Sequence, residues 1–244
     1  MKTALVYDWL CSWGGAERTL LELNKIFPKA PIYTSIYKPK KASFAQEFPK
    51  IKTTFLQKLS FLNHRLLAPL MPMAFENFDF SDFDLIISVT SFAAKGIIVR
   101  PPTKHICYLL TPTRFLWYPK QYSGANFPKL IKNYLKSWDL IASQRPDQIV
   151  AISKTVQDRC QKIYQRKSSI IYPPIDTKLF SPGKTKSCIS AERGFFLIVS
   201  RLERQKKIDL AIEVFNDLGW PLKIIGTGSW ERKLKNLARK NIEF

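Results

Sequence analysis

The chain has 244 residues, of which 45% are hydrophobic and 13% aromatic, and this composition excludes an intrinsically disordered protein. Its 39 Lys and Arg residues against 19 Asp and Glu residues give a formal charge of +20, which favours anionic partners such as phosphates, anionic lipid surfaces or nucleic acid. No apolar run approaches the roughly eighteen residues of a membrane span, and the opening residues do not form a secretory signal.

The four cysteines are far apart in the chain, form no C-x-x-C pair and are accompanied by only two histidines. This spacing argues against a structural zinc site and against a disulfide framework. A reduced, cytoplasmic setting fits the cysteine usage best.

The first element in the chain is an apolar run, TALVYD at residues 3–8, which predicts a strand. Residues 9–27 then predict a turn at Gly14 and Gly15 followed by a helix, with Glu17 in its first turn. Two interpretations of the glycines stay open: a helix N-terminus that a ligand can approach closely, or a strand-to-helix turn that only needs a positive φ.

Short buried strands then alternate with helices and loops. This alternation favours a doubly wound, mainly parallel sheet of seven strands over about residues 1–172. Helices are predicted for residues 125–143 and 154–164. The further strands are predicted at PIYTSIY, KTTFL, FDLIISV, KHICYLL, DQIVAIS and SSIIYP.

The segment from Gln57 to Phe75 is apolar and basic and contains two prolines. Its pattern favours a packed helix that is broken at Pro69 and Pro72. Contact with an anionic membrane surface is the alternative, because basic amphipathic stretches settle at such interfaces.

YPPIDTKLFSPGK, at residues 172–184, predicts a stiff extended connector, after which the strand–helix alternation starts again. We therefore expect an N-terminal Rossmann-like domain over residues 1–172 and a linker over residues 173–193. The start of a second Rossmann-like domain, incomplete in this chain, is expected over residues 194–244, with two or three strands.

Five motifs occur in the order and approximate spacing of a known family. They are GGAER (14–18), FDLIISVTSFAAKG (83–96), TPTRFLW (111–117), AISKTVQDRCQKIY leading to YPPIDTKLF (151–180), and SRLERQKKIDLAIEVF followed by PLKIIGTGSWERKLKNLA (200–238). Together they closely resemble the retaining glycosyltransferases of family 4, over essentially the whole chain. The resemblance implies the GT-B fold and the transfer of a hexose from a nucleotide-diphosphate sugar to a glycan or lipid-linked acceptor, with retention.

The resemblance assigns Arg201 and Lys206 to the catalytic, diphosphate-binding pair. Fixed positive charge is what this chemistry needs, because negative charge builds up on the departing β-phosphate. A solvated basic turn is the alternative, and an ordinary turn is the alternative for the second-domain glycines. The other residues assigned are Gly14, Gly15, Gly226 and Gly228 on the donor side, and Glu17, Ser91, Thr111 and Arg114 on the acceptor side.

Some positions depart from the family pattern. Leu110 stands where close relatives often have a histidine, and His64 and His105 do not replace it by position. The paired glutamates that read the donor would lie beyond the last residue, so we expect residues 1–244 alone to have no appreciable transferase activity.

Asp82 and Asp84 mimic the D-x-D metal motif of the other glycosyltransferase fold, but they directly precede a buried strand and indicate a turn. GT-B enzymes generally work without a bound metal, and the resemblance therefore implies no metal and no cofactor besides the sugar-nucleotide substrate.

Two other functions stay open: a non-catalytic remnant or acceptor-binding module, and a basic protein that binds a membrane surface or nucleic acid. The sequence contains no nucleic-acid recognition motif, so nucleic acid is not an expected partner. The expected location is the cytoplasm, including peripheral attachment to the inner face of the cell membrane.

Overall fold

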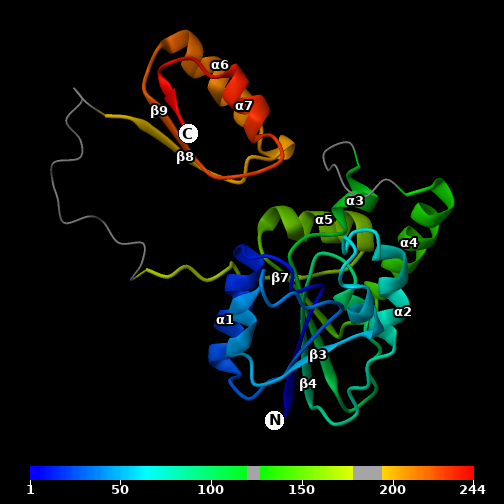
Figure 1. Cartoon of the computed structure of the whole chain (residues 1–244). Helices are drawn as coiled ribbons and strands as arrows, with labels where there is room; N and C mark the ends of the chain where they lie inside the picture. Colours follow the sequence, from blue (N-terminus) through cyan, green and yellow to red (C-terminus); the bar gives the residue numbers. More distant parts are fainter. Residues whose placement is uncertain (120–126, 178–193) are drawn as a thin grey trace. The chain divides into compact units, whose positions relative to one another are not determined.

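The computed structural model describes residues 1–119, 127–177 and 194–244. These residues divide into two compact units, Met1–Ile175 and Asp176–Phe244 (Figure 1).

The first unit is built on a seven-stranded sheet of order β3-β2-β1-β4-β5-β6-β7, in which every strand pair is parallel. The predicted parallel sheet is therefore confirmed. From β1 the chain runs outward to β2 and β3 and then returns to β4 on the other side of β1. The strands are β1 (Thr3–Tyr7), β2 (Ile32–Thr34), β3 (Ile51–Thr53), β4 (Leu85–Thr90), β5 (Lys104–Leu109), β6 (Gln148–Ala151) and β7 (Ser169–Ile170).

Both faces of this sheet are buried, as the residues of β1 show. Ala4 and Val6 belong to the core under the helices that follow β3 and β5, whereas Leu5 and Tyr7 belong to the core under α1. This alternation follows from the two-residue period of a strand. In Figure 1, α1 lies on one side of the sheet and α2 and α4 lie on the other. The helices are α1 (Gly15–Ile26), α2 (Met71–Glu76), α3 (Arg114–Trp117), α4 (Lys129–Ala142) and α5 (Lys154–Tyr164).

Four short 3-10 turns complete the first unit. They are η1 (Ser43–Glu47), η2 (Phe55–Leu59), η3 (Ala68–Leu70) and η4 (Ala94–Gly96).

The single helix predicted between Gln57 and Phe75, broken at its prolines, is wrong. The chain instead forms η2, a turn region, η3 and then α2. Pro69 and Pro72 lie in the first turns of η3 and α2, where a missing N–H leaves no hydrogen bond unmade, so they start elements and break none. The helix predicted from residue 125 begins at Lys129; residues 125 and 126 lie outside the described residues.

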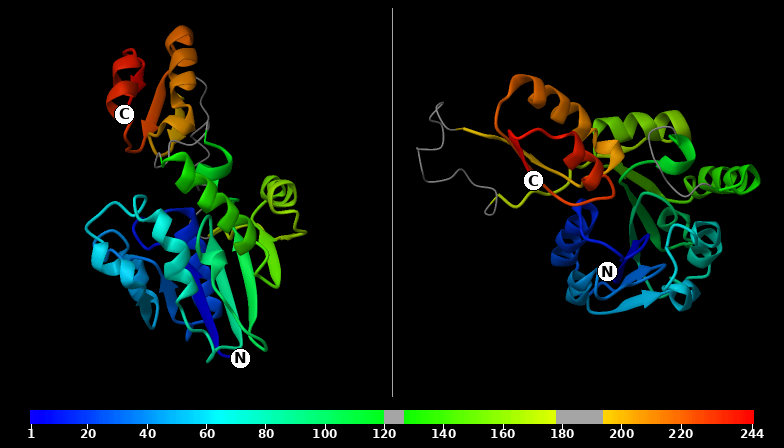
Figure 2. Two further views of the ribbon diagram at one scale, coloured as in Figure 1. Left: turned by 90° about the vertical axis from the view of Figure 1, so that its right-hand side faces the viewer. Right: turned by 45° about the horizontal axis from the view of Figure 1, so that its top comes forward.

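The second unit contains a three-stranded parallel sheet of order β10-β9-β8, with two helices packed on it (Figure 2). Its core includes Leu202, Ile212 and Ile224. The elements are β8 (Phe196–Val199), η5 (Arg204–Lys206), α6 (Ile208–Leu218), β9 (Leu222–Ile225), α7 (Glu231–Leu237) and β10 (Ile242–Glu243).

Across the three described ranges of both units, no helix combines the length and the apolar character that crossing a bilayer requires.

Candidate functional site

The first candidate site lies at the carboxyl edge of the seven-stranded sheet, between β1 and β4. These neighbouring strands lead into connections that run in opposite directions across the sheet. Open α/β sheets bind ligands at such a switch point, because the two diverging loops leave a crevice there.

Asp8, the first residue after β1, organises this edge. Its buried carboxylate accepts hydrogen bonds from the Thr90 hydroxyl at 2.8 Å and from the backbone N–H groups of Ser91 at 2.7 Å, Phe92 at 3.0 Å and Ala94 at 2.8 Å. The bonds fasten the turn after β4 to the end of β1 and place the predicted site residue Ser91 at the switch point. Sequence reasoning missed Asp8; the available signal was an aspartate directly after a buried strand.

The glycine turn follows on the same edge and leaves the N-terminus of α1 open. Gly14 is the N-cap in an extended conformation, with φ near −179°, and neither it nor Gly15 has a positive φ. A Cβ atom added at Gly15 would meet nothing within 4 Å. The turn therefore does not need glycine for its backbone angles. The open space, with no side chain capping the helix, fits a close approach of an anion to the first-turn N–H groups.

Glu17 lies in the first turn of α1 but points into the protein. Its buried carboxylate accepts hydrogen bonds from the Tyr7 hydroxyl at 2.7 Å and from Ser12 Oγ at 3.4 Å. Burial and the neighbouring Glu17 raise the pKa of Tyr7 well above its ordinary value, so this hydroxyl stays protonated and keeps donating. Glu17 thus ties the glycine turn to the end of β1.

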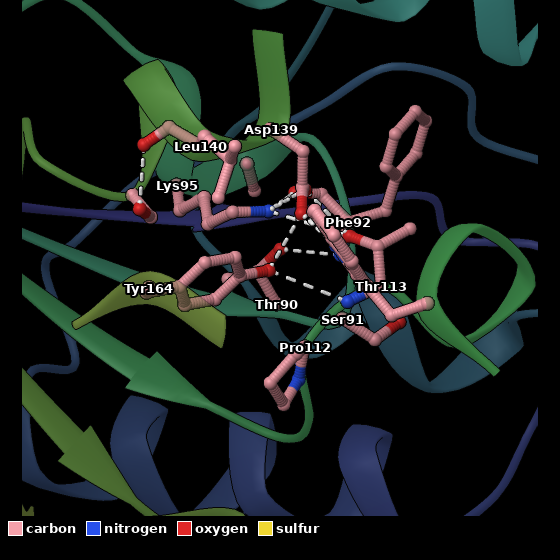
Figure 3. A network of polar contacts seen from close by, with 12 residues as sticks. Thr90, Ser91, Phe92, Lys95, Pro112, Thr113, Asp139, Leu140 and Tyr164 are labelled. Atoms are coloured by element: carbon pink, nitrogen blue, oxygen red, sulfur yellow. Dashed lines mark hydrogen bonds and ion pairs between the residues drawn. The ribbon is translucent and has the colours of Figure 1, made fainter. Parts of the chain in front are cut away.

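A second buried network holds the segment after β5, residues 111–117 (Figure 3). Lys95 Nζ and Asp139 Oδ1 are 2.6 Å apart, and both side chains are at most 1% exposed. Lys95 also donates to the Phe92 carbonyl. The other donors to the Asp139 carboxylate are Thr113 Oγ1 at 2.7 Å, Trp117 Nε1 at 2.7 Å and the Tyr164 hydroxyl at 2.8 Å.

This network fixes two of the predicted acceptor-side residues. Thr111 is buried, and Arg114 begins α3 and is exposed, on backbone that Thr113 and Trp117 anchor on either side. Since the sheet order places the ends of β1, β4 and β5 side by side, the structure brings Gly15, Ser91 and Thr111 to one edge.

The second candidate site lies at the carboxyl edge of the three-stranded sheet. Arg201 follows β8 and Lys206 ends η5, and both side chains are exposed. Glu203, between them, accepts hydrogen bonds from Ser229 Oγ at 2.9 Å and from Ser229 N at 3.4 Å, which ties the loop after β8 to the loop after β9.

Gly226 and Gly228 permit the close contact between these two loops. Gly226 has φ +155°, and a Cβ atom there would lie 1.8 Å from the Ser200 carbonyl oxygen. A Cβ atom at Gly228 would lie 2.2 Å from the Leu202 carbonyl oxygen. Real Cβ atoms do not come this near to backbone, so both positions require glycine to keep the loop that carries Arg201 in place.

Both histidines lie in packed surroundings. The ring of His64 lies 4.8 Å from that of Trp9, and burial, with smaller effects of Arg65 and nearby lysines, lowers its pKa to about 4. His105 is buried with Nε2 2.8 Å from Ser88 Oγ, and burial lowers its pKa to about 3.

Asp82 and Asp84 lie at the opposite, amino edge of the seven-stranded sheet, where Asp84 accepts a hydrogen bond from the Lys2 backbone N–H at 2.6 Å. A cavity of about 650 Å³ lies at this amino edge as well, lined by Thr3, Ile26, Lys50 and Phe83 among others. It is separate from the candidate site.

Cys11, Cys107 and Cys160 are buried free thiols, and Cys188 lies outside the described residues.

Comparison with known proteins agrees with this architecture. The chain is 24% identical over 115 residues to an uncharacterized glycosyltransferase of Methanocaldococcus jannaschii, MJ1178; the match covers 46% of this chain and 30% of that protein. The chain is also similar to the crystal structure of Anabaena Alr3699/HepE in complex with UDP. The match covers 100% of this chain and 68% of that chain, with a TM-score of 0.63 and 17% identity, which shows a shared fold. Residues 13–179 match the family described as Glycosyltransferase Family 4. The chain therefore belongs to glycosyltransferase family 4.

Proposed function

We propose that this chain contributes the donor-side and acceptor-side residues named above to the transfer of a hexose from a nucleotide-diphosphate sugar to a glycan or lipid-linked acceptor, with retention of configuration. The observation that carries the proposal is the pair of exposed cations, Arg201 and Lys206, on a loop held by glycine contacts at the carboxyl edge of the second sheet. Membership of a glycosyltransferase family favours a transferase over a non-catalytic module or a nucleic-acid binding protein.

In this proposal the second unit holds the donor. Arg201 offers a planar fork of N–H donors and Lys206 a compact ammonium, which together suit a diphosphate. Because the bond between sugar and β-phosphate breaks during transfer, charge on the leaving oxygen grows, and fixed cations lower the barrier more than equal binding of the ground state would. The protein's own cations take the role that a metal ion has in other transferases, so the proposal includes no metal and no further cofactor.

The first unit serves the transferring sugar and the acceptor. The open N-terminus of α1 at Gly14 and Gly15 offers N–H groups to an anionic group of the donor, and Ser91, Thr111 and Arg114 follow the neighbouring strands β4 and β5 on the acceptor side. We further propose that the first domain spans residues 1–172, the linker residues 173–193 and the donor-side domain residues 194–244.

The occurrence of UDP in the complex of Anabaena Alr3699/HepE supports a uridine diphosphate donor as the first ligand to test. We place the chain in the cytoplasm, including the inner face of the cell membrane.

The test is calorimetric binding of UDP and GDP to the wild-type chain and to an Arg201→Ala, Lys206→Ala double variant. Loss of two charge-assisted contacts should weaken binding at least about tenfold. The matched control is Lys235→Ala, Lys240→Ala, which removes the same charge at the C-terminal end of α7 and the entry to β10, on the opposite edge of the sheet. Equal losses in the two variants, or unchanged binding in the first, would contradict the proposed site.

A further inference from the structure

A continuous segment of the first unit, residues 55–73, exposes large apolar side chains. Phe61 is 77% exposed and Leu66 is 59% exposed. Phe55, Leu70 and Met73 are each more than two-fifths exposed. Isolated exposed apolar residues are ordinary on protein surfaces, but five within nineteen consecutive residues form a concentrated feature.

The exposed side chains are separate from the ones that pack the segment onto the core. Leu56, Leu67, Met71 and Phe75 are buried in the core beneath α2 and α4. Buried apolar side chains therefore fix the 55–73 segment to the protein, so its exposed apolar residues do not result from loose packing.

Specific hydrogen bonds hold the segment to the carboxyl edge of the sheet. The Gln57 amide accepts from the Tyr37 backbone N–H at 2.8 Å and donates to the Tyr37 carbonyl at 3.0 Å. Lys38 Nζ donates to the Leu62 carbonyl at 3.3 Å. Tyr37 and Lys38 follow β2, so the 55–73 segment lies at the same sheet edge as Asp8 and the glycine turn.

The charges within the segment are of one sign. Residues 48–75 contain no Asp or Glu, whereas Lys58 and Arg65 are exposed within the segment. Lys38 and Lys41 approach it from the loop after β2, since both contribute with Arg65 to the positive field at His64. Exposed apolar groups with cations beside them match the two layers of an anionic membrane surface, acyl chains below and phosphates above.

We infer that the 55–73 segment docks the first unit on an anionic lipid surface, with Phe61 and Leu66 entering the acyl layer and Lys58 and Arg65 contacting lipid phosphates. Lipid suits this surface better than nucleic acid because three of the five exposed apolar side chains, Leu66, Leu70 and Met73, have no ring to stack on a base. Docking on lipid would bring this edge of the sheet to a lipid-linked acceptor. Only that purpose rests on the proposed function.

The experiment is co-sedimentation of the full chain with vesicles of phosphatidylcholine alone and of phosphatidylcholine mixed equally with phosphatidylglycerol. We expect binding to the anionic vesicles only. Phe61→Ser should weaken vesicle binding about tenfold, because serine lacks the apolar area that Phe61 would bury in the acyl layer. Its matched control is Ile26→Ser, which alters a 67% exposed residue at the opposite sheet edge and should leave vesicle binding unchanged.

The charge arm compares Lys58→Gln, Arg65→Gln with Lys29→Gln, Lys50→Gln, two exposed lysines at the amino edge. The first pair should lower affinity for anionic vesicles about fivefold per charge, and the second pair should change it far less. Equal binding to both vesicle types, equal losses in matched variants, or preferential binding to a DNA duplex that displaces the vesicles would overturn the inference.

UDP binding is measured on the same samples, since the vesicle variants lie outside the donor-side loop. Loss of vesicle binding with UDP binding intact identifies the docking segment, whereas absent UDP binding in a wild-type chain that still binds vesicles contradicts only the proposed function. Thermal unfolding of each variant is the control for folding, and we expect the substitutions at these exposed positions to leave the fold intact.

Discussion

The Asp8 carboxylate lies 2.7 Å from the backbone nitrogen of Ser91, so a single side chain joins the ends of β1 and β4 at the switch point of the sheet. The same carboxylate also serves Phe92, Ala94 and the Thr90 hydroxyl. The geometry of the candidate site on this edge therefore depends on one buried charge.

Replacing Asp8 with Ala should lower the free energy of unfolding of the first unit by roughly 3–5 kcal/mol. Each buried donor left without an acceptor costs about 1–3 kcal/mol, and relaxation of the turn recovers part of the sum. Urea unfolding monitored by fluorescence measures the change. Asp82→Ala, which alters an exposed carboxylate at the opposite edge, is the control and should cost much less. A similar loss in the two variants would show that Asp8 does not organise the edge.

Losses of stability at the buried pair Lys95 and Asp139 should not be additive. Lys95→Met or Asp139→Leu alone leaves an uncompensated buried charge and should cost about 3–5 kcal/mol. The double variant should cost less than the sum of the two single variants, which a double-mutant cycle measures. The exposed pair Lys154 and Asp158 serves as the comparison, with an expected coupling below about 1 kcal/mol. Strictly additive losses at Lys95 and Asp139 would contradict the pairing.

Two glycines should respond to alanine in opposite ways. Gly228→Ala should destabilise the second unit strongly, because its Cβ atom would collide with the Leu202 carbonyl. Gly15→Ala should leave the stability of the first unit unchanged or slightly higher, since the space around it is open and alanine favours helix. Thermal unfolding compares the two, and UDP titration of Gly15→Ala then tests for lost access. A stable Gly228→Ala variant would show that the loops can separate without cost.

The stability of the first unit should fall as the pH is lowered from 7 to 5. Burial lowers the pKa of His105 from 6.5 to about 3. The full stability of the folded state is therefore kept above pH 6.5, where His105 is neutral in the unfolded chain as well. Stability is lost as the pH falls toward 3, because His105 binds a proton in the unfolded chain but stays neutral in the folded chain. The loss at pH 5 is on the order of 2 kcal/mol from His105, and His64, which is partly exposed and has a pKa of about 4, adds a smaller loss.

Urea midpoints at pH 7 and pH 5 check this dependence. The difference in urea midpoint between pH 7 and pH 5 should decrease in His105→Gln. It should nearly vanish in a His64→Gln, His105→Gln double variant, whatever the absolute stability of each variant. An unchanged difference in the double variant would assign the acid sensitivity to other groups.

Local patterns were sufficient to predict the mainly parallel sheet, because buried strands alternate with helices along the chain. The family was predicted from the resemblance of five motifs. Local patterns failed between Gln57 and Phe75, where the composition suits a helix but the prolines each start a new short element. Sequence reasoning also missed the pairing of Lys95 with Asp139, which are 44 residues apart and meet only because α4 packs beside η4.

The glycines show the same limit in a different form. Gly14, Gly15, Gly226 and Gly228 all follow strands and are alike in sequence, yet only the second pair has a neighbouring carbonyl where a side chain would stand. The contact that distinguishes them comes from another loop. A pattern read along one stretch of chain carries no information about such a neighbour.

The core clusters divide along the same line as the two units. The core residues on both faces of the seven-stranded sheet all belong to the first unit, and the core residues around Leu202, Ile212 and Ile224 all belong to the second. Each core is therefore built from residues of a single unit. Exchange of either unit between relatives by recombination would preserve the residues of both cores, which gives this family a route to new combinations of its two units.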